Sequence, residues 1–142
     1  MDNKQITFKL IEASLKREKV LFETDDENGL LKILFENGLI GLVFNSIDKN
    51  SFKEPKHYQK LKEIFGQFVS KDIQQLALLE SLKKLFSDNK IDHIFLKGAH
   101  LKFLYPETYM RGMGDIDLLV RKEQFEEAMK ILESNGYKFS SA

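Results

Sequence analysis

The chain has 142 residues, 42% apolar and 31% charged, which is the size and composition of one soluble globular domain. Its 22 basic side chains balance 22 acidic ones, so a nucleic-acid partner or an anionic membrane surface is not expected. The absence of cysteine excludes a disulfide framework, a cysteine-ligated zinc site and a thiol nucleophile. Charged residues interrupt the N-terminal sequence every few positions, so we expect no signal peptide, no membrane span and a cytoplasmic location.

The first part of the chain carries apolar residues at spacings of three and four, which is the periodicity of amphipathic helices. This pattern predicts helices over residues 4–23, 27–37 and 39–48. Asp25 or Asp26 can cap the second of them, and Gly38 suits its C-terminal end.

A fourth, much longer helix follows a polar loop over residues 51–56. Pro55 is expected in its first turn, and the apolar pattern continues to about Ser87, with a loosening at Gly66. Together the four helices form a predicted helical N-terminal region over residues 1–90.

Beyond residue 90 the pattern changes from helix to strand. The apolar run His93–Leu96 predicts a buried strand, because polar residues and a glycine bound it. The elements expected after it are a short helix over 99–105, a loop over 107–114, a strand over 115–120, a helix over 122–135 and a third strand beginning at 137–139. The predicted fold class is α/β (α+β), with a β-α-β-α-β mixed-sheet core over residues 91–142 that packs as one domain with the helices.

Two acidic residues, Asp115 and Asp117, lie two positions apart on the second predicted strand. Their side chains share one face of that strand, while Ile116 and Leu118 enter the core on the other. Carboxylates held this close repel each other unless a cation lies between them, and Mg²⁺ prefers such oxygen ligands. The pair therefore indicates a metal site, and the alternative is an exposed strand face that carries two acids without a function.

The turn at Lys97-Gly98 and the residue Arg111 suggest a place for phosphate. Backbone N–H groups at the start of a helix attract anions, and a glycine such as Gly98 lets a phosphate approach the main chain. Arg111 precedes Asp115 by four residues and suits a bidentate phosphate contact. An ordinary tight turn, a solvated lysine and a surface arginine are the alternative interpretations.

In combination, these motifs resemble the uncharacterised nucleotidyltransferase family of the DNA polymerase beta-like superfamily. The resemblance covers about residues 75–139 and rests on Phe95-Leu96-Lys97-Gly98-Ala99, Leu104-Tyr105-Pro106, the run from Arg111 to Val120, Leu132 and Asn135-Gly136-Tyr137. Several linked motifs make it more specific than any one of them.

The resemblance implies Mg²⁺-dependent transfer of a nucleoside monophosphate from a nucleoside triphosphate, with ATP first, to an unknown hydroxyl acceptor on a protein or small molecule. The nucleotide would be bound by Lys97, Gly98, Ala99 and Arg111. Asp115 and Asp117 would be the catalytic and metal-binding residues of a two-metal site.

Three departures from the family pattern keep other readings open. Ala99 replaces a glycine or hydroxyl residue, the spacing from Gly98 to Asp115 is long, and no third carboxylate follows on a later strand, so one metal lacks a ligand. Glu123, Glu126, Glu127 and Glu133 lie on a solvated helix and are poor substitutes. The alternatives are a degenerate or truncated module that binds nucleotide or protein without catalysis, and a fragment of a longer enzyme. The sheet edge at 137–139 is expected to be unfinished and to permit a homo-oligomer.

Overall fold

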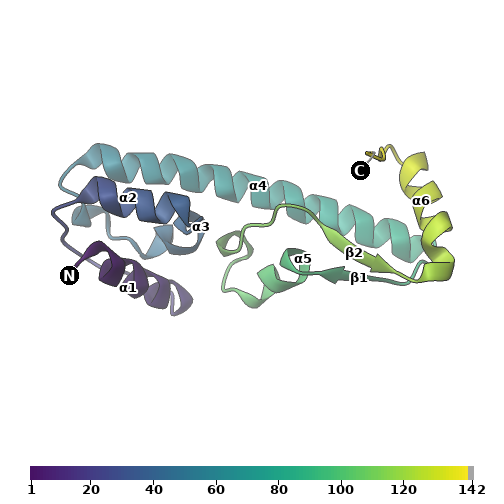
Figure 1. The fold of residues 1–142 in the computed structure, drawn as a ribbon, viewed down its shortest axis with the longest axis horizontal. Coiled ribbons are helices and arrows are strands. Elements are labelled where there is room, and N and C mark those ends of the chain that lie inside the picture. The colour runs from purple at the N-terminus through teal and green to yellow at the C-terminus, as the bar shows by residue number, and fades with distance from the viewer. Residues whose placement is uncertain (141–142) are drawn as a thin grey trace.

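The computed structural model describes residues 1–140 as an elongated molecule (Figure 1). Its helices are α1 (Asn3–Leu15), α2 (Glu27–Glu36), α3 (Ile40–Val43), α4 (Pro55–Asp88), α5 (Gly98–Leu101) and α6 (Phe125–Ser134). Two strands, β1 (His93–Leu96) and β2 (Asp117–Val120), form an antiparallel pair. Short 3-10 helices η1 to η5 cover Phe44–Ser46, Lys49–Ser51, Lys102–Leu104, Thr108–Met110 and Lys122–Gln124.

Local signals place the starts of the helices as predicted. Asp26 is confirmed as the N-cap of α2, because its side chain accepts a hydrogen bond of 2.9 Å from the Gly29 N–H. Pro55 is the first residue of α4, where its missing N–H costs no hydrogen bond. Gly38, just past α2, has the left-handed φ of 62° that is common after a helix end.

The ends of several predicted helices differ from expectation, including the one over 99–105, since α5 ends at Leu101. α1 ends at Leu15 rather than at 23, because Arg17 takes a φ of 58° and Val20 then forms a parallel bridge with Ile47. The third helix is also shorter than 39–48, since α3 ends at Val43 and tightens into a 3-10 turn. In contrast, α4 runs through Gly66 without a break.

The 34-residue helix α4 is about 50 Å long and packs against both ends of the molecule. Its first half, with Leu61 and Phe68, packs on an apolar cluster built by α1, α2 and α3. Its second half, with Leu79 and Leu82, packs on two smaller clusters that hold the sheet and α6. No helix within the described residues is both long enough and apolar enough to cross a membrane.

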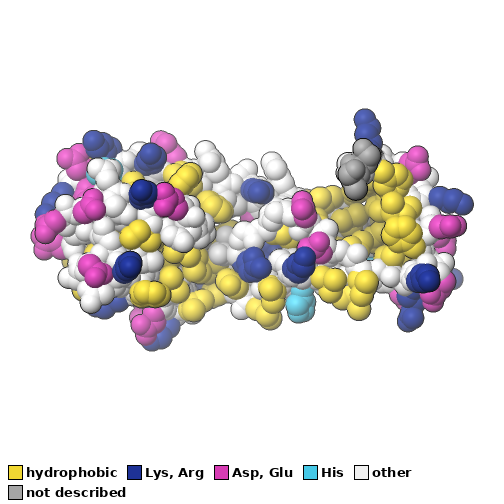
Figure 2. Space-filling view, in the orientation of Figure 1, with side chains coloured by type: hydrophobic (Ala, Val, Ile, Leu, Met, Phe, Trp, Pro, Cys, Tyr) yellow, Lys and Arg dark blue, Asp and Glu magenta, His cyan; other side chains and the backbone are white. Residues whose placement is uncertain are grey.

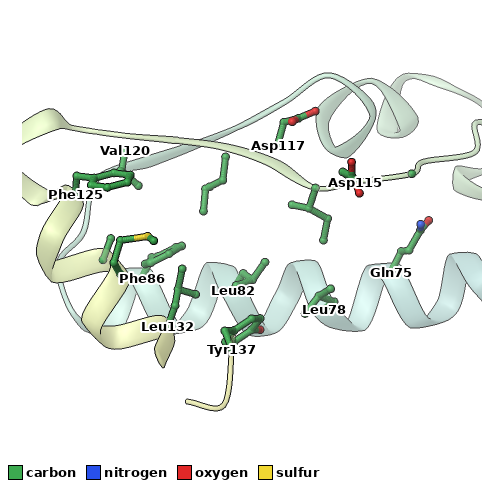
Figure 3. Close-up of a pocket in the computed structure, with 15 residues that line it drawn as sticks. Gln75, Leu78, Leu82, Phe86, Asp115, Asp117, Val120, Phe125, Leu132 and Tyr137 are labelled. Atoms are coloured by element: carbon green, nitrogen blue, oxygen red, sulfur yellow. The ribbon is translucent and has the colours of Figure 1, made fainter. Parts of the chain in front are cut away.

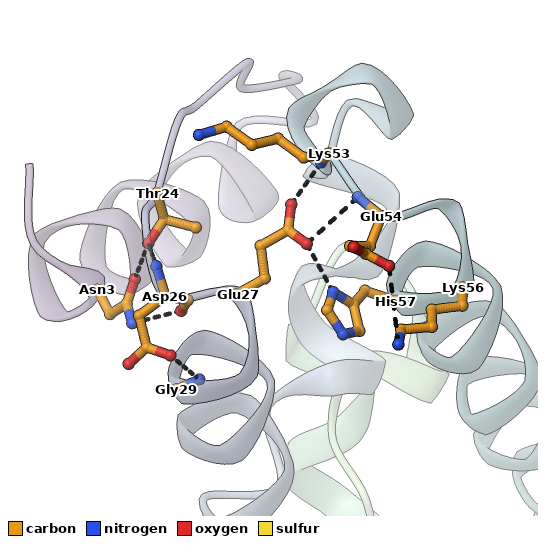
Figure 4. A network of polar contacts seen from close by, with 9 residues as sticks. All are labelled: Asn3, Thr24, Asp26, Glu27, Gly29, Lys53, Glu54, Lys56 and His57. Carbon is orange, nitrogen blue, oxygen red and sulfur yellow. Dashed lines mark hydrogen bonds and ion pairs between the residues drawn. The ribbon is translucent and has the colours of Figure 1, made fainter.

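A buried carboxylate, Glu27, fastens α2 to the beginning of α4 (Figure 4). Its Oε2 atom lies 2.6 Å from Nδ1 of His57, and it also accepts hydrogen bonds from the backbone N–H groups of Lys53 and Glu54. Burial raises the pKa of Glu27, but these hydrogen bonds together outweigh it and hold the pKa below its ordinary value. The charged form of Glu27 therefore stabilises this corner of the fold.

The α+β class is confirmed, whereas the third strand predicted to begin at 137–139 is not formed. The two strands pair in antiparallel register, with Leu96 opposite Asp117 and Ile94 opposite Leu119. The Tyr137 N–H donates to the Leu132 carbonyl at 3.1 Å, so it completes the end of α6 instead of a sheet ladder. Within residues 1–140 the sheet is therefore antiparallel rather than mixed, and residues 137–139 are not part of it, while a homo-oligomer stays a prediction.

Candidate functional site

The acid pair lies where the chain enters β2. Asp117 is the first residue of the strand and Asp115 lies in the turn before it, so the strand predicted over 115–120 begins at 117 and does not carry both acids. Between and after them, Ile116 and Leu118 pack into the apolar clusters, as the alternation of a strand predicts. Asp115 is exposed and the Asp117 side chain is 41% exposed, so both carboxylates are accessible to a ligand.

The turn after β1 approaches the acid pair because the strand register places Leu96 opposite Asp117. The next residue, Lys97, extends its Nζ to 3.6 Å from Asp117 Oδ2. The Lys97 side chain is 76% exposed, so this ion pair adds little stability. The structure therefore brings together two of the residues predicted for the site, one cationic and one acidic.

Lys97 also has an unusual backbone conformation, with φ 52° and ψ −128°. Residues other than glycine rarely adopt this region, and those that do are strained and concentrate at functional sites. At the Lys97-Gly98 turn the positive φ belongs to Lys97 and not to the glycine.

Gly98 and Ala99 are buried at the start of α5. A Cβ atom on Gly98 would lie 3.1 Å from Cγ of Met113, so the turn packs closely against the Met113 side chain at this glycine. The Ala99 methyl group packs with Leu79 and Met113 in an apolar cluster. The structure thus gives packing reasons for both residues, and their contact with phosphate remains a prediction.

Arg111 lies on the loop that leads to the acid pair. Its NH1 group donates to the Gly112 carbonyl at 2.9 Å. Among residues 1–140 no carboxylate lies within ion-pair distance of Arg111, so the guanidinium is available to an anion. The structure shows no contact that joins it to Asp115 or Asp117.

Polar residues on α4 hold this loop in place, and sequence reasoning missed them. Asp72 accepts a 2.7 Å hydrogen bond from Thr108, and Gln75 donates from its side-chain amide to the Met113 carbonyl. Asp72 lies four residues after Phe68 and four before Leu76, on the apolar stripe of the helix. A charged residue in the apolar stripe of a helix is the sequence signal that could have identified Asp72.

An apolar cleft of about 630 Å³ opens between α4, β2 and α6 (Figure 3). Gln75, Asp115 and Asp117 lie at one end of it, and the remaining wall is apolar, with Leu82, Phe86, Leu132 and Tyr137 among its residues. In the space-filling view, apolar side chains surround this hollow (Figure 2). The candidate metal ligands therefore lie beside an accessible concave surface.

The donor set suits a hard divalent ion that keeps other ligands. Within residues 1–140 no group of three or more His, Cys, Asp or Glu side chains is placed to hold a metal. Mg²⁺ is commonly held by one or two carboxylates, with water and phosphate oxygens completing its octahedron. Asp115 and Asp117 are two accessible carboxylates of the kind that such an ion takes.

Comparison with known proteins identifies a family model that matches most of the chain. The family model described as uncharacterised nucleotidyltransferase matches residues 23–142, which is more than four-fifths of the chain. The match includes all the candidate site residues and reaches upstream through α4, α3 and α2. No curated protein and no solved structure matches the chain.

Proposed function

The chain belongs to the uncharacterised nucleotidyltransferase family, and from this premise we propose that it transfers a nucleoside monophosphate from a nucleoside triphosphate to a hydroxyl acceptor. ATP is the first nucleotide to test, and the acceptor is a protein or a small molecule. The observation that supports the proposal is the accessible pair Asp115 and Asp117 beside the cation of Lys97 at a strand-to-turn junction. Acids with a neighbouring cation suit the binding of a metal-complexed polyphosphate.

Asp115 and Asp117 would hold Mg²⁺, which when bound neutralises charge on the phosphate oxygens and polarises the phosphorus under attack. The reaction needs the acceptor oxygen to bond to the α-phosphorus while pyrophosphate leaves with the bonding electron pair and the hydroxyl proton passes to solvent. The protein contributes mainly by positioning charge.

The triphosphate would lie over the turn formed by Lys97, Gly98 and Ala99. Lys97 already places its ammonium group 3.6 Å from Asp117, and Arg111 carries a second cation without a carboxylate partner in the described chain. Both cations would contact phosphate oxygens, and Arg111 can do so with two parallel hydrogen bonds.

A second candidate function is nucleotide binding without transfer. It is favoured by the acid pair standing without a third carboxylate among residues 1–140. A two-metal mechanism ordinarily needs further ligands for the second ion. The two functions share the same binding residues and differ in turnover.

Labelled ATP separates these possibilities. We expect label at the α-phosphate, and not at the γ-phosphate, to move to the protein or to a hydroxyl acceptor in the presence of Mg²⁺. Asp115→Ala should abolish the transfer, whereas Asp88→Ala should not, because Asp88 is an exposed residue paired with Lys84 at the end of α4. Mg²⁺-dependent binding without transfer would support the second function, and neither binding nor transfer would refute both.

A further inference from the structure

A buried ion pair lies at the middle of the molecule. Lys102 is 0% exposed, and its Nζ lies 2.5 Å from Oδ1 of Asp72, whose side chain is 7% exposed. The other oxygen of Asp72 accepts a 2.7 Å hydrogen bond from the Thr108 hydroxyl. The three residues come from η3, α4 and η4, so one carboxylate joins three elements.

The ion pair makes few hydrogen bonds for such a buried position. Within the described residues, neither Lys102 Nζ nor Asp72 Oδ1 has a hydrogen-bond partner beyond their mutual contact. An ammonium group has three N–H donors, and leaving donors unpaired in a buried site is costly. Replacing a buried pair of this kind by apolar residues often leaves stability unchanged or raises it, so stability alone is a weak reason for its presence.

The location of the pair indicates what else it does. Lys102 directly follows α5, the helix that begins at the Lys97-Gly98 turn. Thr108 begins η4, in the segment that leads to Arg111 and Asp115. Asp72 therefore ties both sides of the candidate site to one point on α4.

Neighbouring contacts act on the same segment. One turn further along α4, Gln75 holds the Met113 carbonyl two residues before Asp115. At the other end, Arg17 binds the Glu107 carboxylate at 2.9 Å. Arg17 and Gln75 thus hold the segment at Glu107 and Met113, and Asp72 holds it at Thr108.

We propose that Lys102 is a positioning residue, which acts through Asp72 to set the Lys97–Ala99 turn against the segment that carries Arg111 and leads to Asp115. The inference rests on the proposed function, since it assigns both parts to one nucleotide site. Small displacements between groups that must contact one ligand reduce affinity and rate strongly. A buried directional contact limits such displacements better than apolar packing does.

Two sets of variants test this role without leaving an unpaired buried charge. The double variant Lys102→Met with Asp72→Leu removes both buried charges. Its control is Lys84→Met with Asp88→Leu, which removes an exposed ion pair on α4. Thr108→Val removes one hydroxyl at nearly constant shape, whereas Thr108→Ser retains the hydroxyl and should restore the parent behaviour.

The first measurement is Mg²⁺-ATP affinity by calorimetry, with melting temperature beside it. We expect the buried double variant to raise Kd about tenfold while its melting temperature shifts by no more than about 3 °C. Thr108→Val should raise Kd about fivefold, and Thr108→Ser should not. An unchanged Kd in both the buried double variant and Thr108→Val would overturn the proposal.

Hydrogen–deuterium exchange gives a readout that does not depend on nucleotide. Faster exchange in the buried double variant should be confined to residues 97–115, with residues 27–65 unchanged. If the parent binds no Mg²⁺-ATP, the proposed function fails, and this exchange pattern then decides only whether the buried pair holds residues 97–115 together. Uniformly faster exchange over the whole chain, or unchanged exchange, would show that the buried pair does not specifically stabilise residues 97–115.

Discussion

Replacing Lys97 by glycine should stabilise the fold while weakening nucleotide binding. In the structure Lys97 has φ 52° and ψ −128°, a conformation that costs a residue with a Cβ atom about 1–3 kcal/mol. Glycine removes that cost, but it loses about 0.5–1 kcal/mol more conformational entropy on folding. The exposed ion pair with Asp117 is worth at most about 1 kcal/mol and is lost as well.

The matched control is Lys97→Ala, which removes the ammonium group but keeps the Cβ atom and its strain. The difference between the two variants therefore isolates the backbone. We expect Lys97→Gly to exceed Lys97→Ala by about 1 kcal/mol in free energy of unfolding, or about 2–4 °C in melting temperature for a chain of this size. Urea denaturation at equilibrium measures the first quantity and calorimetry the second.

Both variants should weaken Mg²⁺-ATP binding, because each lacks the cation beside Asp117. A glycine variant no more stable than the alanine variant would show that residue 97 is not strained. Unchanged affinity in both variants would remove Lys97 from the nucleotide site.

Three other predictions concern Gly66, Gly98 and Glu27. Gly66→Ala should raise the free energy of unfolding by about 1 kcal/mol in urea denaturation, because the new methyl group meets nothing within 4 Å on α4. Gly98→Val should weaken Mg²⁺-ATP binding and lower the melting temperature, because even a Cβ atom would lie 3.1 Å from Met113; Gly98→Ala should show the same effects in smaller measure. The pKa of Glu27 lies below its ordinary 4.5, because its hydrogen bonds outweigh the burial that raises it. The contribution of ionised Glu27 to the free energy of unfolding is therefore complete above pH 4.5 and is lost as the pH falls through the lowered pKa. The difference in unfolding free energy between the parent and Glu27→Gln should therefore shrink as the pH falls below 4.5, and a constant difference would contradict this assignment.

The parts of the fold that sequence could predict are those set by local chemistry. Asp26, Gly38 and Pro55 act within a turn of their own helices, so their roles could be predicted without tertiary information. The end of α1 depends on a bridge between Val20 and Ile47, which are distant in the sequence. Periodicity carries no information about such a contact, so the predicted helix was too long.

The missing strand at 137–139 has a similar cause. Tyr137 has the residue type of a strand, but its N–H completes the end of α6 and its ring packs with the cluster of Leu82 and Phe86. A residue used by a helix terminus cannot also supply that hydrogen bond to a sheet. Local sequence favoured both outcomes, and tertiary packing selected one.

Within the candidate site, strand alternation predicted which residues around Asp115 and Asp117 face the core. The ties from Asp72, Lys102 and Thr108 could not be predicted, because they join elements separated by about thirty residues of sequence. The strained conformation at Lys97 was also hidden, since a neighbouring glycine is the usual location for it.

The most direct test of the account is the Mg²⁺ dependence of ATP binding, measured by calorimetric titration of the parent chain and of Asp117→Asn. We expect Mg²⁺ to raise ATP affinity at least about tenfold in the parent and Asp117→Asn to remove this gain. The control Asp88→Asn, an exposed acid with its own lysine partner, should retain it. Equal affinity with and without Mg²⁺, or equal gains in the parent and Asp117→Asn, would contradict the assignment of the acid pair as the metal site.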